Sequence, residues 1–160
     1  MAAARGRSSR LELPGALWSN GPVKSGRLLA LDYGARKVGI ALCDEMGIAV
    51  QPAPALANKG RRDLVARIRR LVEQYSIEGV VIGLPLNMDG TAGESAAEAR
   101  KFMQTLEAEL NLPLTAIDER LTTVEAAELW KKMSPRRQKK YRSVDSLAAA
   151  LILRRYLDEK

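Results

Sequence analysis

The sequence predicts a single α/β domain built on a mixed sheet of five strands, with helices packed against it. Three observations carry this prediction. Short apolar runs between glycines come first, a helical apolar period follows from residue 61, and apolar runs then alternate with helical segments. The first three strands should form an antiparallel meander, whereas the two strands joined through helices should be parallel. A chain of 160 residues can bury one core of this kind.

The antiparallel meander is predicted over residues 27–32, 37–43 and 48–50. Its first strand is an apolar run that ends in a carboxylate, Asp32, and tight turns join it to the second strand and the second to the third. Pro52 and Pro54 should end the third strand, because proline cannot donate a hydrogen bond to a neighbouring strand.

Helices and buried strands alternate over the rest of the chain. The predicted helices cover residues 61–75, 91–110, 122–133 and 143–157, and the predicted parallel strands cover residues 79–83 and 114–118. In the first helix, Leu64, Ile68 and Leu71 recur at helical spacing and form an apolar stripe that should face the sheet. Pro135 should end the third helix, since proline removes a backbone donor.

Composition narrows the possible chemistry. The chain has no histidine and one cysteine, Cys43, which excludes Ser-His-Asp and Cys-His catalysis and zinc sites of four cysteines or of histidines. No intrachain disulfide can form, which fits a reducing compartment. No apolar stretch approaches the ~20 residues that span a membrane. Hydrolysis near neutral pH would therefore depend on carboxylates and a hard metal ion.

The charge is uneven and predicts a polyanionic partner. The net charge is +7, and residues 131–142 hold seven basic residues and no acidic one. Basic clusters bind nucleic acid by releasing its counterions, and the alternative is a solvated surface. Residues 1–25 are also basic and lack the apolar core of a secretory signal, so we interpret them as a flexible extension of a domain over 26–160. An organelle transit peptide is the alternative for this segment.

Acidic residues stand where the predicted elements could bring them together. Asp32 ends the first strand, Asp118 and Glu119 end the fifth, and Asp145 begins the last helix. Sites in α/β sheets collect at the carboxyl ends of strands, and clustered carboxylates repel one another unless a cation such as Mg²⁺ or Mn²⁺ joins them. Each acid alone could instead form a turn or favour a helix dipole. The prediction of a metal site depends on all three elements reaching one rim.

Several other residues are candidates for contacts to a phosphate backbone. The loop over residues 83–91 precedes a helix N-terminus, where backbone N–H groups suit phosphate, although it could equally be an ordinary connection. The candidates for substrate binding are Gly34, Arg36, Lys37, Asn87, Asp89, Gly90, Arg120, Arg136, Arg137, Lys139 and Lys140. The alternative for the charged ones is solvent exposure without a ligand.

Four segments in order resemble the motifs of the YqgF (RuvX) family, described as pre-16S rRNA nucleases and as Holliday junction resolvases. They are LDYGARKVGIA at 31–41, GLPLNMDGT at 83–91, DERLTT at 118–123 and DSLAAALIL at 145–153. The resemblance covers residues 27–157. It implies a ribonuclease H-like fold and a cytoplasmic, divalent-metal endonuclease that matures the 5′ end of 16S rRNA.

Carried over by position, the resemblance implies that Asp32, Asp118 or Glu119, and Asp145 are the catalytic residues and the ligands of Mg²⁺ or Mn²⁺. The expected partner is nucleic acid, with no membrane, and the protein should be a monomer or a weak homodimer. Two alternatives stay open. A resolvase of branched DNA would need two active sites and therefore a dimer. A non-catalytic RNA-binding assembly factor would need the basic segment but not the acids.

Overall fold

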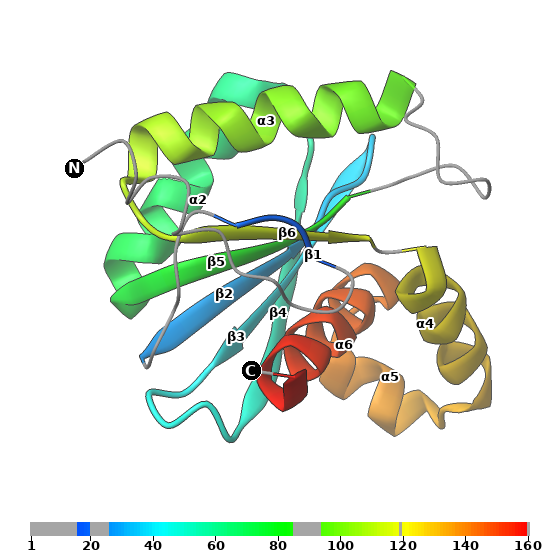
Figure 1. The fold of residues 1–160 in the computed structure, drawn as a ribbon. Coiled ribbons are helices and arrows are strands. Elements are labelled where there is room, and N and C mark those ends of the chain that lie inside the picture. Colours follow the sequence, from blue (N-terminus) through cyan, green and yellow to red (C-terminus); the bar gives the residue numbers. More distant parts are fainter. Residues whose placement is uncertain (1–15, 20–25, 85–93, 119, 160) are drawn as a thin grey trace.

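The computed structural model describes residues 16–19, 26–84, 94–118 and 120–159. These residues form three layers, in which a mixed sheet separates two groups of helices (Figure 1). The sheet has six strands in the order β1-β6-β5-β2-β3-β4. Helices α2 (Arg61–Tyr75) and α3 (Glu94–Leu110) cover one face. Helices α4 (Arg120–Lys132), α5 (Pro135–Tyr141) and α6 (Val144–Glu159) lie on the other.

The five predicted strands are present with the predicted directions. Strands β2 (Arg27–Asp32), β3 (Lys37–Cys43) and β4 (Val50–Ala57) form the antiparallel meander. Strands β5 (Ile77–Leu84) and β6 (Leu114–Asp118) continue the sheet in parallel from β2. The structure adds a sixth strand, β1 (Ala16–Ser19), antiparallel to β6. Four residues of the predicted extension 1–25 therefore belong to the sheet, because the open edge of β6 offers unpaired backbone groups.

The third meander strand differs most from its prediction. It begins at Val50 rather than at residue 48, and it continues past both Pro52 and Pro54. β4 is an edge strand of the sheet and pairs only with β3. A proline at a position whose N–H would point away from β3 therefore removes no hydrogen bond between the strands. The register with β3 also shifts by one residue between the positions of Ala53 and Leu56, which places Pro54 in a bulge.

The helices follow the prediction, with one addition. Helix α2 has the predicted bounds, and the chain between Lys132 and Pro135 breaks as expected. The basic segment, for which the sequence predicted no element, forms the short helix α5. The Ser134 hydroxyl accepts a hydrogen bond from the Arg137 amide (3.3 Å), and Pro135 stands in the first turn, where its missing donor is harmless. The same proline that ends one helix therefore starts the next.

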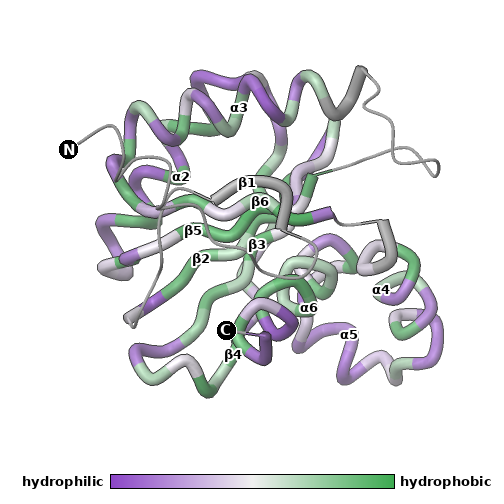
Figure 2. The backbone as a smooth tube through the Cα atoms, viewed as in Figure 1, coloured by the Kyte–Doolittle hydropathy of each residue, from purple (hydrophilic) through white to green (hydrophobic). Residues whose placement is uncertain are grey.

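The hydropathy of the chain differs between the sheet and the surface helix α5. In Figure 2 the strands are mainly hydrophobic, whereas α5 is hydrophilic along its length and has no buried residue. No helix in the described ranges is long and apolar enough to cross a membrane.

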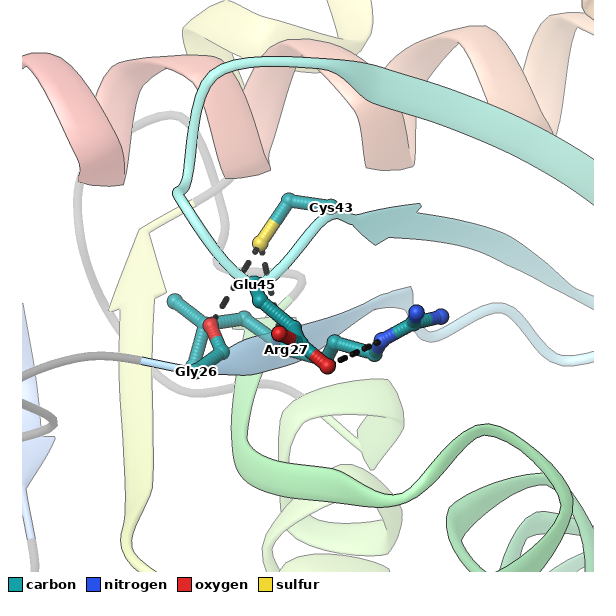
Figure 3. A network of polar contacts seen from close by, with 5 residues as sticks. Gly26, Arg27, Cys43 and Glu45 are labelled. Carbon is teal, nitrogen blue, oxygen red and sulfur yellow. Dashed lines mark hydrogen bonds and ion pairs between the residues drawn. The ribbon is translucent and has the colours of Figure 1, made fainter.

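Cys43 lies at the end of β3, beside the start of β2 (Figure 3). Its thiol accepts a hydrogen bond from the Leu28 amide (3.3 Å) and lies 4.0 Å from the Gly26 carbonyl oxygen. An ion pair between Arg27 and Glu45 (3.9 Å) lies next to it at the surface. The side chain of Cys43 is buried, as expected of a small apolar residue at the end of a strand. This end of β2 is the one opposite Asp32.

Candidate active site

Asp32 is the last residue of β2 and is only 8% exposed. Its partners in the two neighbouring strands are both glycines, Gly39 of β3 and Gly83 of β5. The carboxylate therefore has no side chain beside it within the sheet. This leaves space next to it for another element, and that element is the start of α6.

The start of α6 lies directly on Gly39. A Cβ atom at this glycine would stand 1.9 Å from the carbonyl oxygen of Asp145, a distance that no side chain could tolerate. Glycine is therefore required by a close approach of two backbones. Because Gly39 is also the partner of Asp32 in the sheet, this contact brings the first turn of α6 to the end of β2.

Ser146 holds the start of α6 against β3 and β4 through hydrogen bonds of its side chain. Its hydroxyl donates to the Ala53 carbonyl oxygen (2.6 Å) and accepts from the Ile40 amide (3.4 Å), so it links α6 to both β3 and β4. Ser143 caps the helix, since its hydroxyl accepts from the Ser146 amide (3.1 Å). Asp145 stands between these two serines. The position of Asp145 is therefore set by hydrogen bonds of the neighbouring Ser146 to residues 93 and 106 positions away in the chain.

The two carboxylates interact electrostatically. Burial, and to a lesser degree the negative charge of Asp145, raise the pKa of Asp32 from 3.8 to about 7. Near neutral pH, Asp32 is therefore balanced between its protonated and ionised forms, and a cation beside the pair would favour ionisation. The atoms available as metal ligands are carboxylate oxygens, which hard divalent cations prefer. Mg²⁺ is commonly bound by one or two carboxylates together with substrate phosphates. The side chains of Asp32 and Asp145 therefore fit Mg²⁺ or Mn²⁺ by the chemistry of their ligand atoms.

Asp118 does not join the pair in the same way. It ends β6 opposite Leu84, and the alternation of the strand places it in phase with Ala116, which packs in the core beneath α2 and α3. Ile117, one residue earlier, packs on the α6 side. Within the described residues, no three acidic or cysteine side chains form a group that could hold a metal. Glu119, the other predicted acid at this strand end, lies outside those residues.

The predicted phosphate contacts fall into three groups. Gly34, Arg36 and Lys37 form the turn after Asp32, where both basic side chains are exposed, and Asn58 holds the turn by hydrogen bonds to the carbonyl oxygens of Gly34 (2.9 Å) and Arg36 (2.7 Å). The α5 residues Arg136, Arg137, Lys139 and Lys140 are all exposed. Asn87, Asp89, Gly90 and the side chain of Arg120 lie outside the described part of the chain.

Sequence reasoning missed the roles of Gly39 and Ser146. From the sequence alone, Gly39 suggests tight packing or the close approach of a ligand without indicating that α6 packs there, and Ser146 carries no assigned role. A signal for Ser146 exists in hindsight: a small hydroxyl residue beside an acid, in the first turn of an otherwise apolar helix, is well placed to bridge neighbouring backbone groups.

Comparison with known proteins gives consistent results. The family model RuvX, described as Holliday junction resolvase, matches residues 26–159. A protein of Syntrophus aciditrophicus named "Putative pre-16S rRNA nuclease" is 43% identical over 132 residues, covering 82% of this chain and 88% of the relative. A protein of Lachnospira eligens with the same name is 41% identical over 137 residues, covering 84% of this chain and 98% of the relative.

Solved structures show the same fold at much lower identity. RuvC of T. thermophilus, in complex with a Holliday junction substrate, superposes with a TM-score of 0.55 at 12% identity, covering 83% of this chain and 95% of that one. The fowlpox virus Holliday junction resolvase gives a TM-score of 0.53 at 13% identity, covering 84% and 99%. These likenesses confirm the predicted fold, which is that of RuvC-like resolvases.

Proposed function

The chain belongs to the RuvX family, and from this membership and the carboxylate pair we propose that it hydrolyses phosphodiester bonds of precursor 16S rRNA, at the 5′ end. The observation that carries the proposal is the contact that brings Asp145 to the buried Asp32. Relatives above 40% identity are named for pre-16S rRNA, whereas the resolvase structures share only 12–13% identity. The RNA substrate is therefore favoured over branched DNA.

In this proposal Asp32 and Asp145 hold a Mg²⁺ or Mn²⁺ ion. When bound, such an ion activates water and stabilises the leaving oxygen of a phosphodiester. The protein contributes position and charge. The sheet excludes water from one side of Asp32, and the two serines hold Asp145 at a fixed place. Because the pKa of Asp32 is raised, its ionised form depends on a nearby positive charge.

Of the two acids predicted at this strand end, Asp118 and Glu119, we favour Glu119 as the third ligand. Thr115 and Ile117 lie on the α6 side of the sheet, the side on which α6 brings Asp145 to Asp32. Asp118 is in phase with the opposite face. The turn residues Arg36 and Lys37, and the basic helix α5, would hold the phosphate backbone of the RNA.

The test is cleavage of an RNA that contains the 5′ leader and the mature start of 16S rRNA, with Mg²⁺ or Mn²⁺ supplied and withheld. We expect Asp32→Asn and Asp145→Asn to lose cleavage. Asp158→Asn, an exposed carboxylate in the last turn of the same helix, is the matched control and should keep full activity. Undiminished cleavage by Asp32→Asn would refute the site.

The two alternatives are decided by separate measurements. Nicking of a four-way DNA junction by a dimeric species, with no cleavage of the leader RNA, would favour a resolvase. Full complementation of a deletion strain by the double variant Asp32→Asn/Asp145→Asn would favour a non-catalytic assembly factor.

A further inference from the structure

The short link between α5 and α6 contains an unusual backbone turn. Arg142 has φ 75° and ψ −57°, and the amide of Ser143 donates a hydrogen bond to the carbonyl oxygen of Tyr141 (2.8 Å). These are the features of a γ-turn with positive φ at its centre, which is rare and strained for any residue with a side chain. Glycine would adopt it without this cost.

The other non-glycine residues with positive φ show how exceptional Arg142 is. Within the described residues they are Ser76 (φ 52°) and Asn111 (φ 54°). Ser76 caps the end of α2 in the ordinary left-handed region, and Asn111 follows the end of α3. Short polar residues are tolerated at such positions. Arg142 has a long side chain and lies outside that region.

The turn cannot relax, because packing holds both of its sides. Tyr141 packs against the small cluster formed by Ala126, Leu147 and Ala148. On the other side, Ser143 caps α6, whose first turn is already bonded to β3 and β4. A strained residue that persists between two fixed elements is a candidate for function, since a glycine there would relieve the strain.

The position of Arg142 indicates what that function is. It precedes Asp145 by three residues, so the two Cα atoms are at most ~11 Å apart. Its side chain is exposed, and it forms no ion pair with any residue that the structure describes. The basic residues of α5 lead directly to it along the chain. An exposed guanidinium three positions before Asp145, with no ion pair among the described residues, suits one ligand in particular, a phosphate group, which it can bind through two parallel hydrogen bonds.

We propose that Arg142 binds a backbone phosphate of the nucleic acid next to the bond that is cut, and that its strained turn holds it beside the acidic pair. This inference rests on the proposed nuclease function, but it assigns a specific residue that neither the motifs nor the family resemblance identified. In this proposal α5 attracts the phosphate backbone of the nucleic acid, and Arg142 fixes the register of that backbone relative to the acidic pair.

The experiment compares Arg142→Gly, Arg142→Lys and Ser76→Gly as full-length proteins. Both glycine variants should raise the melting temperature, because each removes a side chain from a positive-φ position. Arg142→Gly should also raise KM for the leader RNA about tenfold or more, in line with the loss of a charge-assisted contact. The slope of log affinity against log salt should fall by about one. Arg142→Lys should keep that slope, and Ser76→Gly should keep wild-type KM and slope.

The outcomes separate this inference from the function on which it rests. If the wild-type protein neither cleaves nor binds the RNA, the proposed function is wrong. If it is active and Arg142→Gly retains its KM and salt slope, only the role of Arg142 is wrong. Should Arg142→Gly be poorly folded, Arg142→Asn keeps the test intact, since asparagine tolerates positive φ. A lower melting temperature for both variants would overturn the strain argument.

Discussion

The two faces of the sheet are built from different kinds of residue. On the α2/α3 face, large side chains such as Leu31, Ile82 and Phe102 fill the space, and the ring of Tyr33 lies 5.0 Å from that of Phe102. On the α6 face, alanines and a glycine let the helix approach closely. The four polar residues that are buried within the described part of the chain lie on the side of α4 and α6; they are Asp32, Thr115, Thr122 and Ser146.

This difference shows how the fold separates stability from chemistry. An apolar face gains free energy from burial with no polar group to satisfy. The α6 face gives up part of that gain, because it buries a carboxylate and needs hydrogen bonds such as those of Ser146 to compensate. Changes on the α6 face should therefore alter activity and stability together, and sometimes in opposite directions, whereas changes on the α2/α3 face should alter stability alone.

The largest effect is expected for Gly39→Ala. The new methyl group would collide with the backbone of Asp145 and push α6 away from the sheet. We expect a loss of ~3 kcal/mol or more in the free energy of unfolding, with loss of cleavage. Urea unfolding and the RNA cleavage assay measure the two effects. Wild-type stability in this variant would contradict the close approach.

Asp32→Asn should separate activity from stability. The pKa of Asp32 is higher in the folded protein, about 7 against 3.8, so the folded state binds more protons and wild-type stability declines as pH rises between these values. Asparagine carries no charge at any pH. We expect the variant to be inactive yet more stable at pH 8 by up to a few kcal/mol, at ~1.4 kcal/mol for each pKa unit.

The measurement for Asp32→Asn is thermal unfolding at pH 4 and pH 8 without divalent metal. The variant and the wild-type protein should unfold at similar temperatures at pH 4, because the carboxyl is protonated in the folded state and pH 4 lies close to the unfolded pKa of 3.8, so ionisation of the unfolded state has only begun to lower wild-type stability. A variant that is less stable than wild type at pH 8 would show that the raised pKa of Asp32 is not a property of the protein.

Ser146→Ala should have an intermediate effect. It removes the hydroxyl that joins α6 to Ile40 and Ala53 and leaves a buried backbone donor and acceptor without their partner. The expected cost is about 1–3 kcal/mol, with a fall in kcat because Asp145 is less firmly placed. Cleavage at saturating RNA checks the second point. Unchanged kcat would show that α6 holds its position without this residue.

The smallest effect is expected for Ile82→Val, the control from the other face. Ile82 is fully buried under α2 and α3, so the loss of one methylene group should cost about 1 kcal/mol. Neither kcat nor KM should change. A clear loss of activity in this variant would break the proposed division between the faces.

Much of the architecture was predictable from local pattern. Alternating and helical periods locate four of the five predicted strands and the four long helices, and α2 matches its predicted bounds, whereas the third strand shares only Val50 with its prediction. The placement of Asp32 and Asp145 at one rim was also predictable, because parallel strands share an edge and the small residues of α6 allow close packing. The pairing of β1 with β6 was not, since an edge strand takes its partner from backbone groups that carry no sequence pattern.

The sequence by itself determined which residue types were available for catalysis. The absence of histidine and the single cysteine exclude His-dependent catalysis and zinc sites of four cysteines, and they favour carboxylates. Only the tertiary structure decided which carboxylates meet. Asp118 is in phase with residues that pack beneath α2 and α3, whereas the contact of α6 with Gly39 brings Asp145 to the end of β2, where Asp32 lies. The physical reason is the separation along the chain of the residues that interact. Periodicity reflects the environment of residues close in sequence, whereas a contact such as that between Ile40 and Ser146, 106 residues apart, forms only when the whole sheet has formed.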